Sequence, residues 1–487
     1  METLKSFPLT SYTSYVVGLT LLLLTGCGQE SEQQAAGAEV TGPSIERDLA
    51  DIKKEGTLRA LTVYSGTTYF LYRGLPMGYE FEMLERFADY LDVELELVVA
   101  KDVNKLIAML NRGEGDILAH GMAITSNRKQ KISFTDYLYL TKQVLIQKKP
   151  DNWRSIRWNV LEDSLIQNAI GLLGDTVSVR KNSSYRERIA NLSEELGDTI
   201  HVKELSGEMA TDEIIKKVVE GEIEYTIADD NIAGIMASYY PILDIDVPVS
   251  FSQRIAWGTR KNSPDLLQAT NAWIKNFKKE VDYNVIFNKY FKNTKDFRRR
   301  VKSEFYSLNT QEISPYDELI KAHSAPLGWD WRLVASLIYQ ESRFDPKNSS
   351  WASAEGLMQL MPATAKELGV TNRMDPEENI RGGIRHLKEL NEKFENVQDS
   401  IQRIKLTMAS YNCGYYHVRD AQKLAEKRNL NPLVWDDHVE NIILKLSSPE
   451  YYNDPVVKYG YVRGIEPYNY VKQIFERYRH YTQFIER

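Results

Sequence analysis

The chain has 487 residues and a formal net charge of −7, with 43% hydrophobic and 26% charged residues. This length predicts at least two folded units, and the composition excludes an extensively disordered, collagenous or multi-span membrane protein. The acidic balance disfavours a dedicated nucleic-acid binder, which usually carries a strongly basic face. Aromatic residues reach 11%, including 29 Tyr, which suits surfaces that stack on sugars but is also ordinary core material.

The first residues predict export. An apolar run at 15–24 has the length of a signal-peptide core and is too short to span a bilayer as a helix. It ends in Leu24-Thr25-Gly26-Cys27, which resembles the lipobox of bacterial lipoproteins, where the Cys is acylated. We therefore expect a signal peptide at 1–27 and a protein held at the periplasmic face of the outer membrane, lipid-anchored through Cys27 or peripheral. The alternative is a cleaved signal in which Cys27 is incidental.

A flexible tether is expected at 28–44, which is rich in Gln, Glu, Ala, Gly and Ser and lacks an apolar period. Cys413 is the only Cys besides Cys27. If Cys27 is lipidated, no intramolecular disulfide can form, even in an oxidising compartment.

Residues 45–295 alternate strand-like runs with amphipathic helices. Strands are predicted at 57–64, 94–100 and from 116, with helical apolar spacing at 81–91 and 103–110. This rhythm predicts an α/β sheet that binds ligands at the carboxyl ends of its strands. No glycine-rich nucleotide-binding loop occurs, so a nucleotide cofactor is not expected.

Four short motifs of this unit resemble the periplasmic solute-binding proteins of family 3, over about 58–291. They are Gly78-Tyr79-Glu80-Phe81-Glu82, Thr125-Ser126-Asn127-Arg128, Gly174-Asp175-Thr176 and Ala228-Asp229. The resemblance implies a two-lobed α/β domain that closes by hinge motion on a muropeptide or amino-acid-like ligand.

The ligand chemistry that this resemblance implies is consistent with the residue types. Arg128, in the stretch with Thr125, and the Thr176 turn would hold an α-carboxylate. Asp229 would hold an α-ammonium group, and Tyr69 would wall the cleft. The alternatives are a surface salt bridge for Arg128 and a helix N-cap for Asp229.

Residues 296–312 are expected to be a linker, because basic side chains crowd this junction. They are Lys292, Lys295, Arg298, Arg299, Arg300 and Lys302. We interpret the cluster as a solvated interdomain segment; the alternative is contact with anionic lipid headgroups or an acidic polymer.

Residues 313–487 are helical by pattern, and one carboxyl group stands out in them. Asp330 is a good N-cap for a helix whose apolar stripe includes Val334 and Leu337, and Glu341 falls on the same face. Burial on that stripe predicts a raised pKa for Glu341, which suits a general acid near neutral pH. The alternative is a Glu at a helix end that extends to water.

Four motifs in order resemble the soluble lytic transglycosylases. They are Gln340-Glu341-Ser342, the stretch at 356–365, Ser410-Tyr411-Asn412-Cys413-Gly414, and Glu466-Pro467-Tyr468-Asn469-Tyr470-Val471. Ser410 and Pro467 depart from the family pattern. The resemblance implies an all-α lysozyme-like domain of the α+β superfamily.

In that resemblance Glu341 is the catalytic residue, and the substrate-binding residues are Ser342, Gly356, Gln359, Tyr411, Asn412 and Tyr470. Core packing is the alternative for the two tyrosines, a structural amide for Gln359 and a tight turn for Gly356. Spacing places Asn412 at a helix end and Pro467 in the first turn of the last helix.

The mechanism implied by the resemblance needs one carboxyl group, whereas ordinary glycosidases use two. Glu341 would protonate the glycosidic oxygen, the 2-acetamido group of the sugar would stabilise the positive centre, and Glu341 would then act as base to close a 1,6-anhydro ring. By contrast, Asp345 looks like a turn residue, Glu355 like an exposed residue and Glu466 like a residue that orients a helix end. No metal is expected, since no HExxH or His/Cys cluster occurs.

Taken whole, the mature chain resembles the membrane-bound lytic murein transglycosylases of type F. This implies peptidoglycan glycan strands as substrate, and we hypothesise that ligand binding in the first unit regulates lysis in the second. Two alternatives remain: a sensor or scaffold that binds glycan without cleaving it, and a solute receptor.

Overall fold

The computed structural model describes residues 43–486. The expected signal peptide, Cys27 and all of the expected tether except its last two residues lie outside this range. Among the helices at 43–486, none combines the length and apolarity that a membrane crossing requires.

The first lobe is built on a mixed sheet in the order β4-β1-β5-β13-β6, with β7 also paired to β13. Strand β1 runs parallel to β4, from Thr57 beside Glu94 to Thr62 beside Val99, as the alternating sequence pattern predicts. The strands are β1 (Thr57–Thr62), β4 (Glu94–Val99), β5 (Ile117–Ala123), β6 (Ser133–Phe134), β7 (Tyr139–Thr141) and β13 (Gln253–Thr259). The hairpin is β2 (Phe70–Tyr72) and β3 (Leu75–Met77). The helices are α1 (Leu49–Glu55), α2 (Tyr79–Leu91), α3 (Leu106–Arg112), α4 (Ser126–Lys131), α9 (Pro264–Phe277) and α10 (Val281–Phe291).

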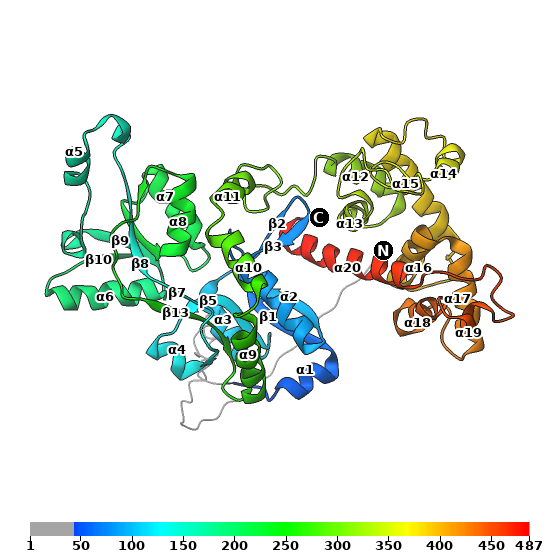
Figure 1. The fold of residues 1–487 in the computed structure, drawn as a ribbon, viewed down its shortest axis with the longest axis horizontal. Helices are drawn as coiled ribbons and strands as arrows, with labels where there is room; N and C mark the ends of the chain where they lie inside the picture. The colour runs from blue at the N-terminus through cyan, green and yellow to red at the C-terminus, as the bar shows by residue number, and fades with distance from the viewer. Residues whose placement is uncertain (1–42, 487) are drawn as a thin grey trace, which may run out of the picture. The chain divides into compact units, whose positions relative to one another are not determined.

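The second lobe has its own five-stranded sheet, in the order β10-β9-β11-β8-β12 (Figure 1). The chain passes from the first sheet to the second at Lys142, between β7 and β8, and returns in β13. The strands of the second lobe are β8 (Gln143–Lys148), β9 (Thr176–Arg180), β10 (His201–Leu205), β11 (Tyr225–Asp229) and β12 (Leu243–Asp244). Its helices are α5 (Trp158–Asp163), α6 (Ser184–Leu196), α7 (Thr211–Glu220) and α8 (Asp230–Tyr239).

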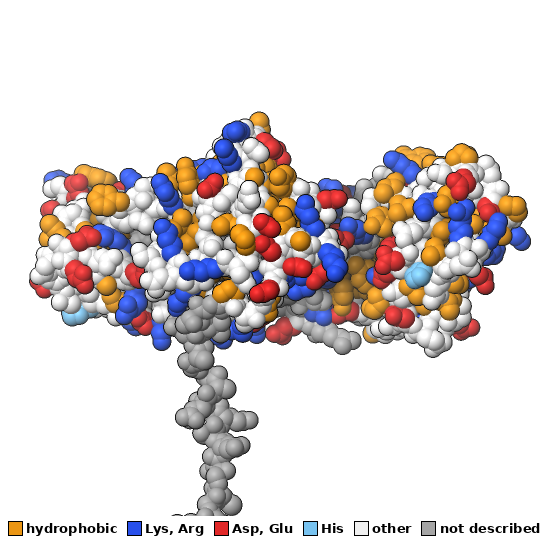
Figure 2. Space-filling view, turned by 90° about the horizontal axis from the view of Figure 1, so that it is seen from below, with side chains coloured by type: hydrophobic (Ala, Val, Ile, Leu, Met, Phe, Trp, Pro, Cys, Tyr) orange, Lys and Arg blue, Asp and Glu red, His pale blue; other side chains and the backbone are white. Residues whose placement is uncertain are grey.

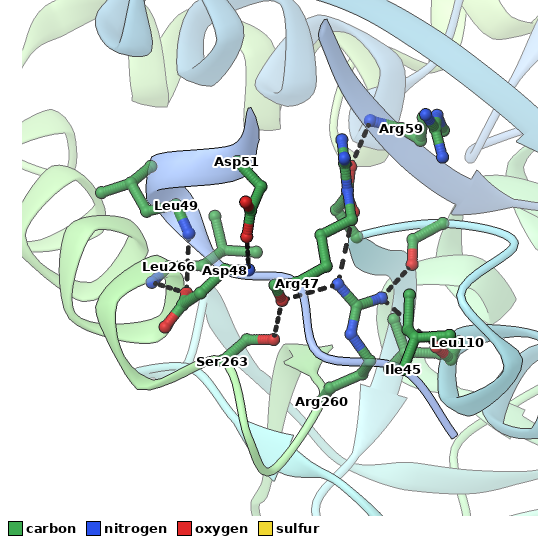
Figure 3. Close-up of polar contacts among 12 residues, drawn as sticks. Ile45, Arg47, Asp48, Leu49, Asp51, Arg59, Leu110, Arg260, Ser263 and Leu266 are labelled. Carbon is green, nitrogen blue, oxygen red and sulfur yellow. Dashed lines mark hydrogen bonds and ion pairs between the residues drawn. The ribbon is translucent and has the colours of Figure 1, made fainter. Parts of the chain in front are cut away.

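A buried ion network fastens the start of the described chain to the first lobe (Figure 3). Asp116 is fully buried and accepts from Arg47 Nε at 2.7 Å and from Arg260 Nη2 at 3.3 Å. Its other oxygen accepts from the backbone N–H of Arg59 at 3.0 Å. The carbonyl of Arg47 in turn accepts from Ser263 Oγ at 2.8 Å. Segments distant in sequence thus share one carboxylate, which is satisfied on both oxygens.

The junction agrees in part with the expected solvated segment, because five of its six basic side chains are exposed and Arg300 alone among the six is buried. Residues 294–301 form helix α11 (Thr294–Val301), in which Phe297 and Arg300 are buried. The Arg300 guanidinium lies over the rings of Phe70 and Tyr290, at 5.8 and 5.6 Å from their centroids. Arginine combines charge with a flat apolar face, so a basic run can pack against aromatic side chains as well as face water.

The C-terminal unit is helical, and α20 packs against α13 and α16 (Figure 1). The fully buried Leu337, Ile338 and Ile474 lie in this part of the core. The helices are α12 (Asp317–Ser324), α13 (Trp331–Ser342), α14 (Pro362–Glu367), α15 (Pro376–Glu392), α16 (Ser400–Cys413), α17 (Tyr415–Lys427), α18 (Glu440–Lys445), α19 (Pro449–Tyr452) and α20 (Ile465–Phe484).

Charged side chains of both signs are mixed over the face seen in Figure 2. This distribution agrees with the modest net charge of −7.

Candidate active site

Glu341 lies in the last turn of α13, where the sequence pattern places it. The helix begins at the N-cap Asp330, whose carboxylate accepts from the backbone N–H of Arg332 at 2.9 Å. It ends directly after Glu341, because Arg343 and Phe344 take left-handed backbone angles of φ 53° and 62°. The Glu341 side chain is partly exposed, so a substrate can reach it.

The surroundings of Glu341 favour its protonated form. Loss of water around the carboxyl group raises the pKa of Glu341 to about 7, and a hydrogen bond from Tyr470 opposes this rise. The Tyr470 hydroxyl donates to Glu341 Oε1. Burial also raises the pKa of Tyr470 well above its usual value, so the phenol stays protonated and remains a donor. The predicted rise in the pKa of Glu341 is therefore present in the structure.

The loop after α13 is held by several of the predicted substrate-binding residues. Ser342 is buried and its hydroxyl donates to the carbonyl of Leu357 at 2.8 Å. Gln359 Nε2 donates to the carbonyls of Asn348 and Gly356 at 3.0 and 2.9 Å. The Gln359 amide nitrogen and the Ser342 hydroxyl therefore both hold the loop together. For Gln359 this agrees with the alternative interpretation, a structural amide.

Gly356 occupies a position that no other residue fits. Its φ is +84°, and a Cβ built there would lie 2.0 Å from the carbonyl oxygen of Arg373. Both the left-handed backbone and the close approach of a second chain segment require glycine. The tight-turn alternative for this residue agrees with that geometry.

Tyr411 and Asn412 lie in the last turn of α16. The Tyr411 hydroxyl donates to the carbonyl of Met358 at 2.7 Å, which ties α16 to the loop. Asn412 is exposed in the last turn of the helix, and Gly414 caps it. Pro467 lies in the first turn of α20, as predicted.

The other three carboxylates of the motifs are engaged elsewhere. Asp345 accepts from the backbone N–H of Lys347 at 2.9 Å. Glu355 pairs with Arg373 at 2.9 Å, and Glu466 pairs with Arg463 at 2.8 Å. Among the four carboxyl groups of this region, Glu341 is thus the one whose side-chain partner is the neutral Tyr470.

The sequence did not predict two asparagines that hold the loop between α13 and α14 in place. Asn379, fully buried on α15, accepts from the backbone N–H of Met358 at 2.7 Å and donates to the carbonyls of Glu355 and Arg373. Asn348 Nδ2 donates to the carbonyl of Glu341 at 3.2 Å. Asn379 could have been predicted from the sequence, because it is a polar residue at an apolar position of the helical pattern.

A second candidate site is a cavity lined by residues of both lobes of the N-terminal unit. Arg128 and Asp229 both line it, as predicted, together with His120, Arg180 and Glu80. Within the described part of the chain, Asp229 Oδ1, His120 Nδ1 and Arg180 Nε are buried without a hydrogen-bond partner. Such groups are costly unless something else satisfies them, which points to a ligand of mixed charge.

Three residues predicted for this cavity lie elsewhere. The Tyr69 hydroxyl faces His480 Nδ1 of α20 at 2.5 Å. Thr125 caps α4 by accepting from the backbone N–H of Arg128, and Thr176 is exposed at the start of β9. Arg180 and His120 were not predicted, because strand alternation gives no sign of which face meets the other lobe.

Comparison with known proteins assigns both units. Residues 62–293 match the family described as bacterial extracellular solute-binding proteins, family 3, and residues 318–434 match the transglycosylase SLT domain. Relatives include a membrane-bound lytic murein transglycosylase F of Desulfosudis oleivorans, 34% identical over 89% of this chain and 91% of that protein. Another of the same name, from Shewanella woodyi, is 30% identical over 94% of this chain and 90% of its own length.

The chain belongs to the membrane-bound lytic murein transglycosylase F family. It is therefore a lytic transglycosylase, a peptidoglycan lyase that acts through its SLT domain. The predicted family, the fold class and the lytic activity are confirmed. Among solved structures, an ancestral arginine-binding protein bound to arginine matches with a TM-score of 0.41 and 23% identity, over 48% of this chain and 98% of that one.

Proposed function

We propose that Glu341 is the single acid–base group of this lytic transglycosylase and that it cleaves the β-1,4 bond between N-acetylmuramic acid and N-acetylglucosamine. Its pKa of about 7 keeps a large fraction protonated at neutral pH, as a general acid requires. The engagement of Asp345, Glu355 and Glu466 elsewhere supports a mechanism with one carboxyl group.

The steps balance without water. Glu341 gives its proton to the glycosidic oxygen, and the C1–O bond breaks as the 2-acetamido oxygen of the muramic acid bonds to C1. The Glu341 carboxylate then takes the proton of the C6 hydroxyl, O6 bonds to C1, and the acetamido oxygen leaves. The product is a 1,6-anhydromuropeptide and Glu341 is protonated again. In this proposal Tyr470 orients the carboxyl group, and Tyr411 and Asn412 are the contacts to the sugar.

Mass analysis of murein digests tests this proposal. The native protein is expected to release muropeptides one water lighter than those from a hydrolase, and Glu341→Gln to release none while still binding murein. Turnover near the native rate in Glu341→Gln, or products that have gained water, would overturn it.

We further propose that the cavity between the lobes binds a ligand with an amino-acid-like end, such as a stem peptide of murein. The guanidinium groups of Arg128 and Arg180 suit a carboxylate, and Asp229 suits an ammonium group. Titration calorimetry with a soluble muropeptide tests this, with Arg128→Ala expected to bind at least tenfold more weakly. Equal affinity in both proteins would remove Arg128 from the site.

Regulation of lysis by this ligand is the next step of the proposal. Helix α20 carries Tyr470, and its last turns contact the first lobe. The Tyr481 hydroxyl donates to the carbonyl of Gly74 at 2.8 Å, and Gln483 Nε2 donates to that of Leu97 at 3.1 Å. A ligand that changes the first lobe can therefore bias the helix that holds the Glu341 partner. Lytic rates that are identical with and without saturating muropeptide would exclude this coupling.

We also propose that the protein is held at the periplasmic face of the outer membrane, lipid-anchored through Cys27 or peripheral. The relatives are named membrane-bound. Fractionation of cells that express native protein or Cys27→Ser tests the anchor, and release of the variant into the soluble fraction is the expected result. If both stay with the membrane, peripheral contact holds the protein.

A further inference from the structure

Two exposed tyrosines of the C-terminal unit form a stacked pair on segments that adjoin active-site motifs in the sequence. Tyr416 and Tyr459 are 57% and 52% exposed, their ring centroids are 4.6 Å apart, and their planes differ by 15°. Tyr416 lies in the first turn of α17, directly after the motif that carries Tyr411 and Asn412. Tyr459 lies in the loop that leads into α20, the helix that carries Tyr470.

The pair is held in place by a buried carboxylate. Asp420 lies one helical turn after Tyr416 on α17 and is fully buried. Its Oδ2 accepts from the backbone N–H groups of Lys458 and Tyr459, at 2.7 and 2.6 Å. These two bonds fix the loop to α17 and set the ring of Tyr459 over that of Tyr416. The stacked arrangement is thus built by the fold, whereas scattered single aromatics on a surface need no explanation.

We propose that Tyr416 and Tyr459 form a subsite that stacks on a sugar ring of the glycan strand beyond the bond cleaved at Glu341. Flat aromatic faces pack against the apolar C–H face of a sugar and leave its hydroxyl groups in water. The occupant is the glycan strand, because both tyrosines are continuous in sequence with segments that form the active site. A polymer bound at Glu341 must run on along the adjoining surface. The inference rests on the proposed role of Glu341 only for the position of the strand.

A binding experiment that needs no turnover tests the subsite. Full-length Glu341→Gln protein is mixed with purified murein sacculi, alone or with Tyr416→Ala or Tyr459→Ala added. Each added substitution is expected to weaken binding roughly 3- to 10-fold, the range for one aromatic stacking contact. Tyr90→Ala is the matched control, since Tyr90 is 54% exposed and lies on α2 of the N-terminal unit.

Kinetics and a conservative variant separate binding from a structural role. With Glu341 intact, Tyr416→Ala is expected to raise KM for murein by a similar factor with little change in kcat, and Tyr416→Phe to restore the native KM. Binding as strong in Tyr416→Ala and Tyr459→Ala as in the Tyr90→Ala control would overturn the subsite, as would a loss confined to kcat. Because the binding arm uses Glu341→Gln throughout, its result stands even if the acid–base proposal fails.

Discussion

At the scale of single residues, the contact between Tyr470 and Glu341 tunes the carboxyl group that we propose as the acid and base. Burial alone would raise the pKa of Glu341 further, and the Tyr470 hydroxyl opposes this by donating to the ionised form. The carboxyl group is thereby poised near neutral pH, where it can give up a proton in one step and accept one in the next.

The first prediction concerns the pH profile. Since Glu341 must enter the reaction protonated, kcat/KM for murein is expected to fall as pH rises above about 7. Tyr470→Phe removes the bond that lowers the pKa, so the alkaline limb of its profile is expected at higher pH. Tyr468→Phe, on the same helix, serves as control and should keep the native limb. A limb that stays in place or moves to lower pH in Tyr470→Phe would contradict this account.

At the scale of elements, the loop between α13 and α14 depends on one glycine and on its contacts with α15. Asn379 of α15 donates to the carbonyl of Arg373 at 2.7 Å, and the same carbonyl leaves no room for a Cβ at Gly356. The loop therefore keeps its shape through close approach of two backbones as well as through hydrogen bonds.

The second prediction tests this close approach. Gly356→Ala is expected to reduce lytic activity strongly and to lower the free energy of unfolding by more than about 2 kcal/mol, because strain and steric overlap add. Gly369→Ala is the control: its φ is also positive, at +70°, but a Cβ there meets nothing within 4 Å. It should cost only about 1 kcal/mol from backbone strain. Equal effects of the two substitutions in thermal melts would show that overlap at Gly356 is unimportant.

Several elements could be predicted from the sequence because their signals are local. The start of α13 at Asp330 follows from an N-cap followed by a 3.6-residue apolar period, and the parallel pairing of β1 with β4 follows from the βαβ rhythm. The basic run at 292–302 could be predicted to face water, and five of its six side chains do, but helix α11 and the burial of Arg300 could not be predicted. Only the aromatic side chains of Phe70 and Tyr290 give Arg300 a place inside.

At the scale of the whole molecule, the network around Asp116 joins the start of the described chain to the first lobe. Removing one partner of a buried ion pair leaves the others without compensation, which costs more than the pair itself contributes. By contrast, a pair between exposed groups contributes little, because water screens both charges.

The third prediction follows from that contrast. Asp116→Asn is expected to lower the free energy of unfolding by about 3 kcal/mol, since the buried Arg260 loses its counter-charge and Arg47 keeps the partly exposed Glu55. Glu114→Gln, which breaks the exposed pair with Arg112 two positions away, should change it by less than about 1 kcal/mol. Chemical denaturation of both variants measures the difference, and similar small losses would mean that the network is not a stabilising feature.

The fourth prediction concerns stability and pH. Burial raises the pKa of Glu80 and of Asp229 to about 7, well above the values of unfolded carboxyl groups. A raised pKa means that their contribution is fully present below about pH 4 and is lost as pH rises through about 7, by on the order of 3 kcal/mol each. Glu80→Gln and Asp229→Asn should therefore flatten the fall in melting temperature between pH 5 and about 8. If the melting temperature of both variants falls as steeply with pH as that of the native protein, this prediction is wrong.

The sequence by itself determined the candidate groups for the chemistry. It placed Glu341 on an apolar helical face, ordered four motifs around it, and divided the chain into an α/β and a helical unit, because helical period, strand alternation and capping are local properties. The tertiary structure alone decided what those groups meet: Tyr470 against Glu341, Asp116 between two arginines, and Arg180 and His120 in the cavity that Tyr69 does not reach. These contacts join residues far apart in the chain, and a local pattern cannot specify which distant side chain completes them.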